Sequence, residues 1–165
     1  DPMDLVEQFG ADTVRFALIY GNATGNDQAL SYTKLEAAKK FINKLRNIAR
    51  FAIEMKPENT SKIQNDEDKK VIENLNKTIK DVTSAIDRYD FNYGLNLLYE
   101  FIWHYFADVY LEQSKKRREE AQETLEEVLK TSLILLHPFM PFITEELYLK
   151  MPDHKESIML EKWPE

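Results

Sequence analysis

The chain has 165 residues, with 22 Lys and Arg side chains against 29 Asp and Glu side chains, so its net charge is −7. This acidic balance excludes a protein that binds nucleic acid over its whole surface, and it confines any such contact to a local patch. The absence of cysteine excludes disulfide scaffolds, cysteine-based zinc sites and thiol nucleophiles, and it is compatible with a reducing cytoplasm.

No apolar run approaches the roughly 20 residues that span a membrane, and the N-terminus carries no targeting pattern. We therefore expect a soluble, cytoplasmic protein of about one domain. Because the sequence begins at Asp1 rather than at a methionine, we expect it to be a piece of a longer chain.

The first thirty residues predict two short helices followed by a loop. Apolar residues predict a first helix that ends at Gly10 and a second helix that ends at Gly21. Residues 22–31 are polar and turn-rich, which predicts a loop. Either Ser31 or Thr33 is expected to cap the helix that follows.

Residues 34–55 predict the central amphipathic helix of the chain. Apolar side chains recur along one side at steps of three and four residues, as is typical of a helix packed on a core: Leu35, Ala38, Ile42, Leu45, Ala49 and Ala52. At about 100° per residue, the opposite side gathers basic and amide side chains: Lys39, Asn43, Arg46, Asn47 and Arg50. The segment holds six positive and two negative charges, a balance of +4 that leaves −11 for the rest of the chain.

Phe51 does not belong to the apolar stripe of this helix. By the same helical arithmetic it lies beside Lys40 and Lys44, at the border of the basic side. An aromatic ring among cations and amides can stack on an unpaired RNA base, so this side predicts a local RNA-binding site. Two plainer interpretations stay open: a merely solvated helix face, and a Phe51 ring that packs under a neighbouring helix.

Two helices are predicted for the middle of the chain. After a polar stretch, apolar residues at alternating steps of three and four predict a helix that Asp66 or Asp68 caps and that continues to Tyr89. Beyond a short corner, residues 92–116 predict an aromatic helix that is apolar almost all round and therefore mostly buried. Its polar stripe repeats every four residues: Asn96, Glu100, His104, Asp108 and Glu112.

The last third predicts two more helices and a tail. A change of charge sign after Arg118 indicates a break between helices. Residues 124–136 predict the next helix, and residues 142–151 predict a last one with Pro141 in its first turn. The tail is expected to lie extended, with apolar residues alternating against polar ones: Ile158, Leu160 and Trp163. We therefore expect an all-α fold, an antiparallel helical bundle with a short N-terminal helical attachment.

Glu100, His104 and Asp108 share one side of the aromatic helix, which would allow metal binding or acid–base chemistry. A lone histidine between acids is more often a hydrogen-bonded structural residue. The sequence contains no G-x-x-x-x-G-K-[ST], G-x-G-x-x-G or H-E-x-x-H motif. We therefore expect no catalytic residue and no metal site in this chain.

Several stretches together resemble one family, the class I aminoacyl-tRNA synthetases for branched aliphatic amino acids, and most closely its valyl members. The stretches follow the family's order over nearly the whole chain: DPMDLVEQFGADTVRFAL, FINKLRNIARF, FNYGLNLLYEFIWHYFADVYLE, LHPFMPFITEELY and SIMLEKWP. The second resembles the first helix of the family's anticodon-binding bundle, and the third resembles its aromatic helix. Arg46 followed by Asn47, by contrast, is similar to the isoleucyl pattern.

The resemblance implies that the chain is the anticodon-binding domain of a valine–tRNA ligase. Residues 1–30 are then the tail of the connection that follows the catalytic domain, and residues 31–165 are the anticodon-binding bundle with its tail. The implied partners are the anticodon loop of tRNA and the catalytic domain of the same parent chain. ATP and Mg²⁺ are implied for that catalytic domain, and no cofactor and no membrane contact for this part.

By the same resemblance, Lys44, Arg50 and Phe51 match positions that contact the anticodon loop. Phe51 is expected to stack on a splayed base, and Arg50 and Lys44 to bind phosphate or a base edge. The helical-face argument adds further candidates: Asn43, Arg46, Asn47, Lys39 and Lys40. Two alternatives remain, the same domain of an isoleucine–tRNA ligase and a helical bundle that binds another protein through this face.

Overall fold

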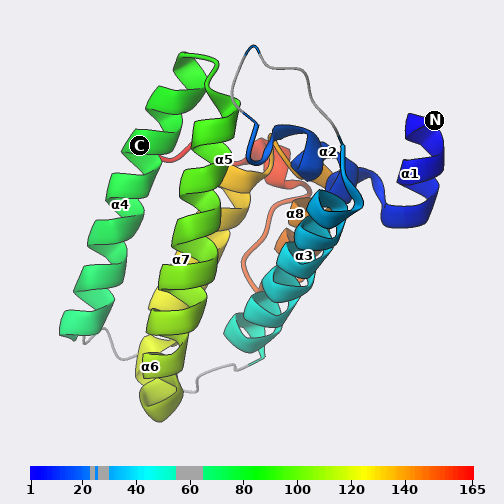
Figure 1. The fold of residues 1–165 in the computed structure, drawn as a ribbon. Coiled ribbons are helices and arrows are strands. Elements are labelled where there is room, and N and C mark those ends of the chain that lie inside the picture. Colours follow the sequence, from blue (N-terminus) through cyan, green and yellow to red (C-terminus); the bar gives the residue numbers. More distant parts are fainter. Residues whose placement is uncertain (23–24, 26–29, 55–64) are drawn as a thin grey trace.

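The computed structural model describes residues 1–22, 25, 30–54 and 65–165, and every regular element within these residues is a helix. Figure 1 shows the long helical segments lying side by side, with α1 projecting at one edge. The elements are α1 (Pro2–Phe9), α2 (Ala11–Ile19), α3 (Tyr32–Ile53), α4 (Asp66–Asp87), α5 (Phe91–Tyr99), η1 (Glu100–Leu111), α6 (Glu112–Ser114), η2 (Lys115–Arg117), α7 (Arg118–Leu136), α8 (Pro141–Tyr148) and η3 (Ile158–Leu160).

Successive long segments run in opposite directions, because short corners connect α4 with α5 and α6 with α7. The predicted all-α class and the antiparallel bundle are therefore confirmed. Within the described ranges, no helix is both long enough and apolar enough to cross a membrane.

Helix α3 buries the apolar stripe that its sequence predicts. The helix starts two residues earlier than expected, and Ser31 caps it by accepting a hydrogen bond from the N–H of Lys34 at 3.3 Å. Thr33 lies inside the first turn and is not the cap, and Met55 lies outside the described residues. The stripe packs against α2, α7, η1 and α8, with these side chains buried: Leu35, Ala38, Phe41, Ile42, Leu45, Ile48, Ala49 and Ala52.

Helix α4 begins with an asparagine cap, so the prediction of Asp66 or Asp68 is wrong. The side chain of Asn65 accepts from the N–H of Asp68 at 2.9 Å, and the Asp68 carboxylate accepts from the N–H of Asn65 at 3.1 Å. This reciprocal capping box leaves Asp68 buried inside the first turn. In this buried position the Asp68 carboxylate also accepts hydrogen bonds from Tyr110 and Arg117, each at 2.5 Å.

The aromatic helix is continuous from Phe91 to Ser114, but its middle, η1, is a π-helix with the wider i→i+5 bonding that periodicity did not predict. Its predicted burial is partly wrong. Trp103 and Tyr105 are half-buried, and Val109 is exposed. Helices α3, α4 and α7 cover the apolar sides of η1 and leave its polar stripe in solvent: Glu100, His104 and Asp108, continued by Glu112.

Helix α7 starts at Arg118, six residues before its predicted start, and α8 ends three residues before its predicted end. The earlier start follows from the short η2 turn, which leaves no room for a longer break after the aromatic helix. Pro141 occupies the first turn of α8, as predicted.

The C-terminal tail is not fully extended. A 3-10 turn, η3, buries Ile158 but exposes Leu160, so the predicted alternation is wrong at Leu160. Trp163 is half-buried, and its indole N–H donates to the hydroxyl of Thr83 at 2.9 Å. This bond fastens the tail to α4.

Candidate nucleic-acid interface

All eight predicted RNA-binding residues lie on the outward side of α3. Two of them, Lys44 and Phe51, are half-buried, and the others are exposed: Lys39, Lys40, Asn43, Arg46, Asn47 and Arg50. Neighbouring helices divide this side into two edges. Lys44 contacts η1, whereas Arg46 contacts α8. The helical arithmetic places Asn43 and Asn47 between these two edges.

At the η1 edge, Lys44 is already held by two side chains of the aromatic helix. Its ammonium donates to the Asp108 carboxylate at 2.7 Å and lies 5.3 Å from the ring centre of Trp103. Both contacts stabilise the cation, the second through the negative face of the indole. Lys44 is therefore a positioned donor with a local counterion, rather than a mobile positive charge.

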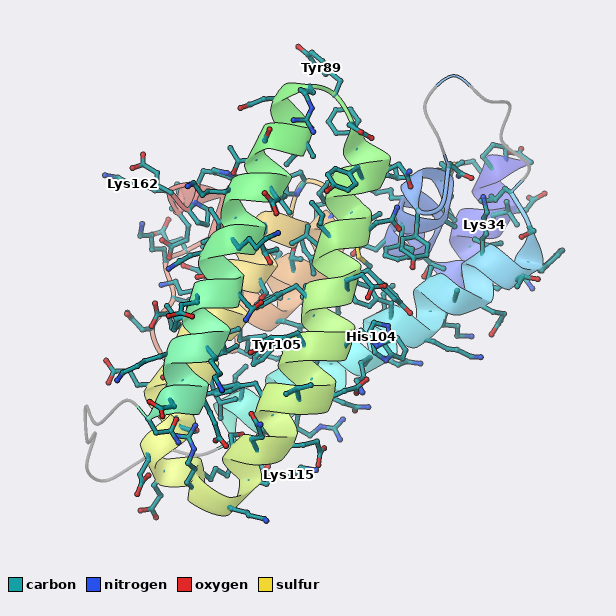
Figure 2. All side chains as sticks on the ribbon, turned by 60° about the vertical axis from the view of Figure 1, so that its left-hand side comes forward. Lys34, Tyr89, His104, Tyr105, Lys115 and Lys162 are labelled. Atoms are coloured by element: carbon teal, nitrogen blue, oxygen red, sulfur yellow. The ribbon has the colours of Figure 1, made fainter. Side chains whose placement is uncertain are left out.

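His104 projects from η1 on the side where α3 lies (Figure 2), and it sits between two acids. Its ring nitrogens are 3.7 Å from Asp108 and 4.0 Å from Glu100, which is longer than a hydrogen bond. All three side chains are exposed. In the described part of the chain, no three His, Cys, Asp or Glu side chains are arranged to hold a metal ion.

At the C-terminal end of α3, Phe51 is fastened to the start of α7. The Arg118 guanidinium carbon lies 4.0 Å from the centre of the Phe51 ring, and its Nη2 donates to the Phe51 carbonyl oxygen at 2.6 Å. The ring also packs on the bundle core. The interpretation that Phe51 packs against a neighbouring helix is therefore confirmed, and its role in stacking on an RNA base stays a prediction.

Sequence reasoning did not assign Arg118 to this site. The run of cations at residues 115–118 was visible, but its only interpretation was a helix break favoured by the backbone dipoles. The guanidinium lies over the Phe51 ring and offers a second plane on which a base can stack. Arg118 therefore joins the candidate interface.

At the α8 edge, a hollow of about 350 Å³ opens between α2, α3 and α8. Lys39, Asn43 and Arg46 line it from α3, and Phe142 and Glu146 line it from α8. The Arg46 guanidinium is 3.5 Å from the Glu146 carboxylate. The hollow thus combines donors, an acid and an exposed aromatic ring, with a nearly balanced charge.

The wall of this hollow is held in place from α2. The Asp12 carboxylate is buried and accepts hydrogen bonds from the N–H groups of Phe142 and Ile143, at 3.4 and 2.6 Å, so it caps α8. Burial raises the pKa of Asp12, and these bonds oppose the rise only in part. Arg15, one turn later, donates to the carbonyl oxygens of Pro138 and Phe139 at 2.8 and 3.1 Å.

The charges on α3 differ in how far they are neutralised. Lys44 and Arg46 have acidic partners on η1 and α8. Lys39, Lys40 and Arg50 make no ion pair with any residue that the structure describes. A positive patch therefore remains on an otherwise acidic chain, and the roles of these residues in RNA binding stay predictions.

Comparison with known proteins identifies the family of the chain. Residues 68–165 match the family described as the anticodon-binding domain of tRNA ligase. The chain is 42% identical to the valine–tRNA ligase of Thermotoga maritima and 41% identical to that of Staphylococcus carnosus, in both cases over 100% of this chain and 20% of the relative. It therefore spans about one fifth of the length of these relatives.

The fold is also similar to one part of a solved synthetase. AgnB2 LeuRS of Agrobacterium radiobacter K84, solved in a ternary complex with tRNA and LeuAMS, superposes with a TM-score of 0.77 at 22% identity, over 99% of this chain and 20% of that chain. The helical bundle, its basic helix and the family match lead to one conclusion. The chain belongs to the family of anticodon-binding domains of tRNA ligases.

Proposed function

We propose that this chain binds the anticodon loop of valine tRNA through the outward side of α3, as part of a valine–tRNA ligase. Full-length identities of about 40% to valine–tRNA ligases support the choice of amino acid. The single observation that carries the proposal is the placement of cations, amides and an aromatic ring on one exposed helix side of an acidic chain.

Each group has a chemical part in this proposal. A splayed base stacks on the surface made by Phe51 and Arg118, whose ring and guanidinium lie 4.0 Å apart. Lys44, held by Asp108, donates to a base edge, while Arg50 meets phosphate. Asn43 and Asn47 carry amides that donate and accept, as base edges require.

The proposal extends to the parent enzyme. Residues 1–30 join the catalytic domain to the bundle of residues 31–165, and that domain uses ATP and Mg²⁺ to attach valine. Anticodon binding then serves to select the tRNA that the catalytic domain charges. We also propose a cytoplasmic location, with which the absence of cysteine is compatible.

The test is a titration of the purified 165-residue chain with valine tRNA transcripts that carry the natural or a swapped anticodon, at two salt concentrations. We expect the natural anticodon to bind at least about fivefold more tightly, the equivalent of ~1 kcal/mol for one stacked base. An isoleucine tRNA transcript serves as the control for specificity.

Three results would overturn the proposal in different ways. Tighter binding of the isoleucine transcript would assign the domain to an isoleucine–tRNA ligase. Equal binding of all transcripts would leave only a general RNA-binding bundle. If the chain bound none of the transcripts, a protein-interaction module would be favoured, whose contacts would change little with salt.

A further inference from the structure

The groove between α3 and α8 continues beyond the hollow already described. A second hollow of about 310 Å³ lies at its C-terminal end and shares Arg46 with the first. Its rim carries three cations: Arg46 and Arg50 from α3, and Lys150 from the turn that follows α8. Its floor is apolar and is formed by Ala49, Ile53 and Leu147. This hollow is on the opposite edge of α3 from Lys44.

The acids around this hollow are already engaged. Glu54 lines it but lies 3.5 Å from Arg118. Glu146 stands between two of the rim cations, with its carboxylate 3.1 Å from Lys150 and 3.5 Å from Arg46. The hydrogen bond from Lys150 and the charge of Arg46 lower the pKa of Glu146, so it is ionised at neutral pH.

We propose that this second hollow binds phosphate groups of the RNA backbone, that Lys150 is a further RNA-binding residue, and that Glu146 is an internal counterion that an incoming phosphate displaces. The inference rests on the proposed function, and it assigns the two edges of α3 to different tasks. The Lys44 and Phe51 edge reads bases, and the α8 edge holds the backbone without regard to sequence.

The charges and distances favour phosphate over other ligands. Three cations around one hollow match an anion, and a guanidinium forms paired hydrogen bonds with phosphate oxygens. The ion pair of Arg46 with Glu146 is long, at 3.5 Å. Replacing Glu146 by a phosphate as the partner of Arg46 therefore costs little interaction energy. Arg50 has no ion pair among the described residues and can bind a phosphate directly.

The experiment compares Lys150→Ala and Glu146→Gln with the wild-type chain, using the natural and the anticodon-swapped valine tRNA transcripts over a salt series. Lys150→Ala should weaken the binding of both transcripts by the same factor. It should also reduce the slope of log K against log salt by about 0.7–0.9, the value of one phosphate contact. Glu146→Gln should increase the affinity for both transcripts.

Matched controls come from α4. Lys77 and Asp81 form an exposed ion pair at 2.7 Å on another helix of the bundle, so Lys77→Ala and Asp81→Asn change the net charge by the same amount. Neither control should change the slope as far as the groove variants do. Lys150 and Glu146 are exposed, so melting curves of all four variants should match that of the wild type.

The outcomes separate this inference from the proposed function. An unchanged slope for Lys150→Ala, with anticodon discrimination intact in the wild type, overturns the phosphate groove and leaves the proposed function standing. A loss confined to the natural anticodon makes Lys150 a base reader and also overturns it. Equal binding of both transcripts by the wild type, with the slope change present, supports the groove and overturns the proposed recognition of the anticodon. A wild-type chain that binds no RNA overturns both.

Discussion

The guanidinium of Arg118 covers the Phe51 ring at 4.0 Å, and the same side chain donates to the carbonyl oxygen of Phe51 at 2.6 Å. The two residues are 67 positions apart, yet the guanidinium lies over the ring at the end of α3. Because Arg118 covers part of the ring, an RNA base can stack on the uncovered part or on the guanidinium plane. The contacts with Arg118 therefore orient Phe51 within the chain itself.

Phe51→Ala should weaken binding of the natural valine tRNA transcript by about 1–3 kcal/mol, because the stacking surface is lost. Titration of the transcript into both proteins measures the difference. Equal affinity of the variant and the wild type would remove Phe51 from the site.

The control for this variant uses both members of the pair. Phe51→Leu keeps apolar packing against the core but has no ring, so it should lose RNA affinity without a matching loss of folding stability. Arg118→Lys keeps the charge but not the plane. It should weaken binding of the natural transcript, while the salt dependence of binding stays as in the wild type.

Lys39→Ala should lower the affinity for any tRNA, whatever its anticodon. Lys39 is exposed and makes no ion pair within the described ranges, so we expect it to meet only phosphate. The slope of log K against log salt should become shallower by about 0.7–0.9. A change in the preference between natural and swapped anticodons would instead make Lys39 a base reader.

Trp103→Ala should destabilise the fold less than Phe106→Ala. Trp103 is half-buried and stacks on Tyr99, with ring centres 5.5 Å apart, whereas Phe106 is fully buried. We expect a loss of about 3–5 kcal/mol for Phe106→Ala and ~2 kcal/mol for Trp103→Ala. Urea unfolding of both variants gives the two values, and equal losses would mean that Trp103 belongs to the core.

Glu161 should contribute stability that disappears in acid. Its carboxylate accepts from the hydroxyl of Tyr148 at 2.5 Å, and Lys130 and Lys155 lie 3.1 Å away, so its pKa falls to about 2. A Glu side chain in the unfolded chain has a pKa of about 4.3. The ionised Glu161 therefore stabilises the fold fully above that pH, and this stabilisation is lost as the pH falls towards 2.

The measurement is acid unfolding of the wild type and Glu161→Gln. The variant should be less stable at neutral pH, and the two free energies of unfolding should converge near pH 2. A difference that persists in strong acid would mean that Glu161 stabilises by packing rather than by its charge.

Local patterns were sufficient to predict most of the fold. The 3.6-residue period places the buried stripe of α3 correctly, because that stripe depends only on spacing along one helix. The cap of α4 was missed because Asn65 and two following aspartates are equally good caps by sequence. Contacts of Asp68 with distant Tyr110 and Arg117 decide between them.

The candidate site was predictable only in part, for the same reason. The face of α3 follows from helical spacing, but the partners that orient it lie far away in the chain. Asp108 is 64 positions from Lys44, and Glu146 is 100 positions from Arg46. The π-helical form of η1 has no signal in the spacing of its apolar residues, so the half-exposed state of Trp103 could not be predicted.

The bond from Asp12 to the start of α8 determines how the chain can be shortened. Met140, at the N-cap position of α8, provides no side-chain acceptor, and the N–H groups of Phe142 and Ile143 rely on a carboxylate about 130 positions earlier. Phe16, from the same helix as Asp12, is buried in the main core. A truncation that removes α2 would therefore leave these N–H groups without their acceptor and loosen one wall of the groove between α3 and α8.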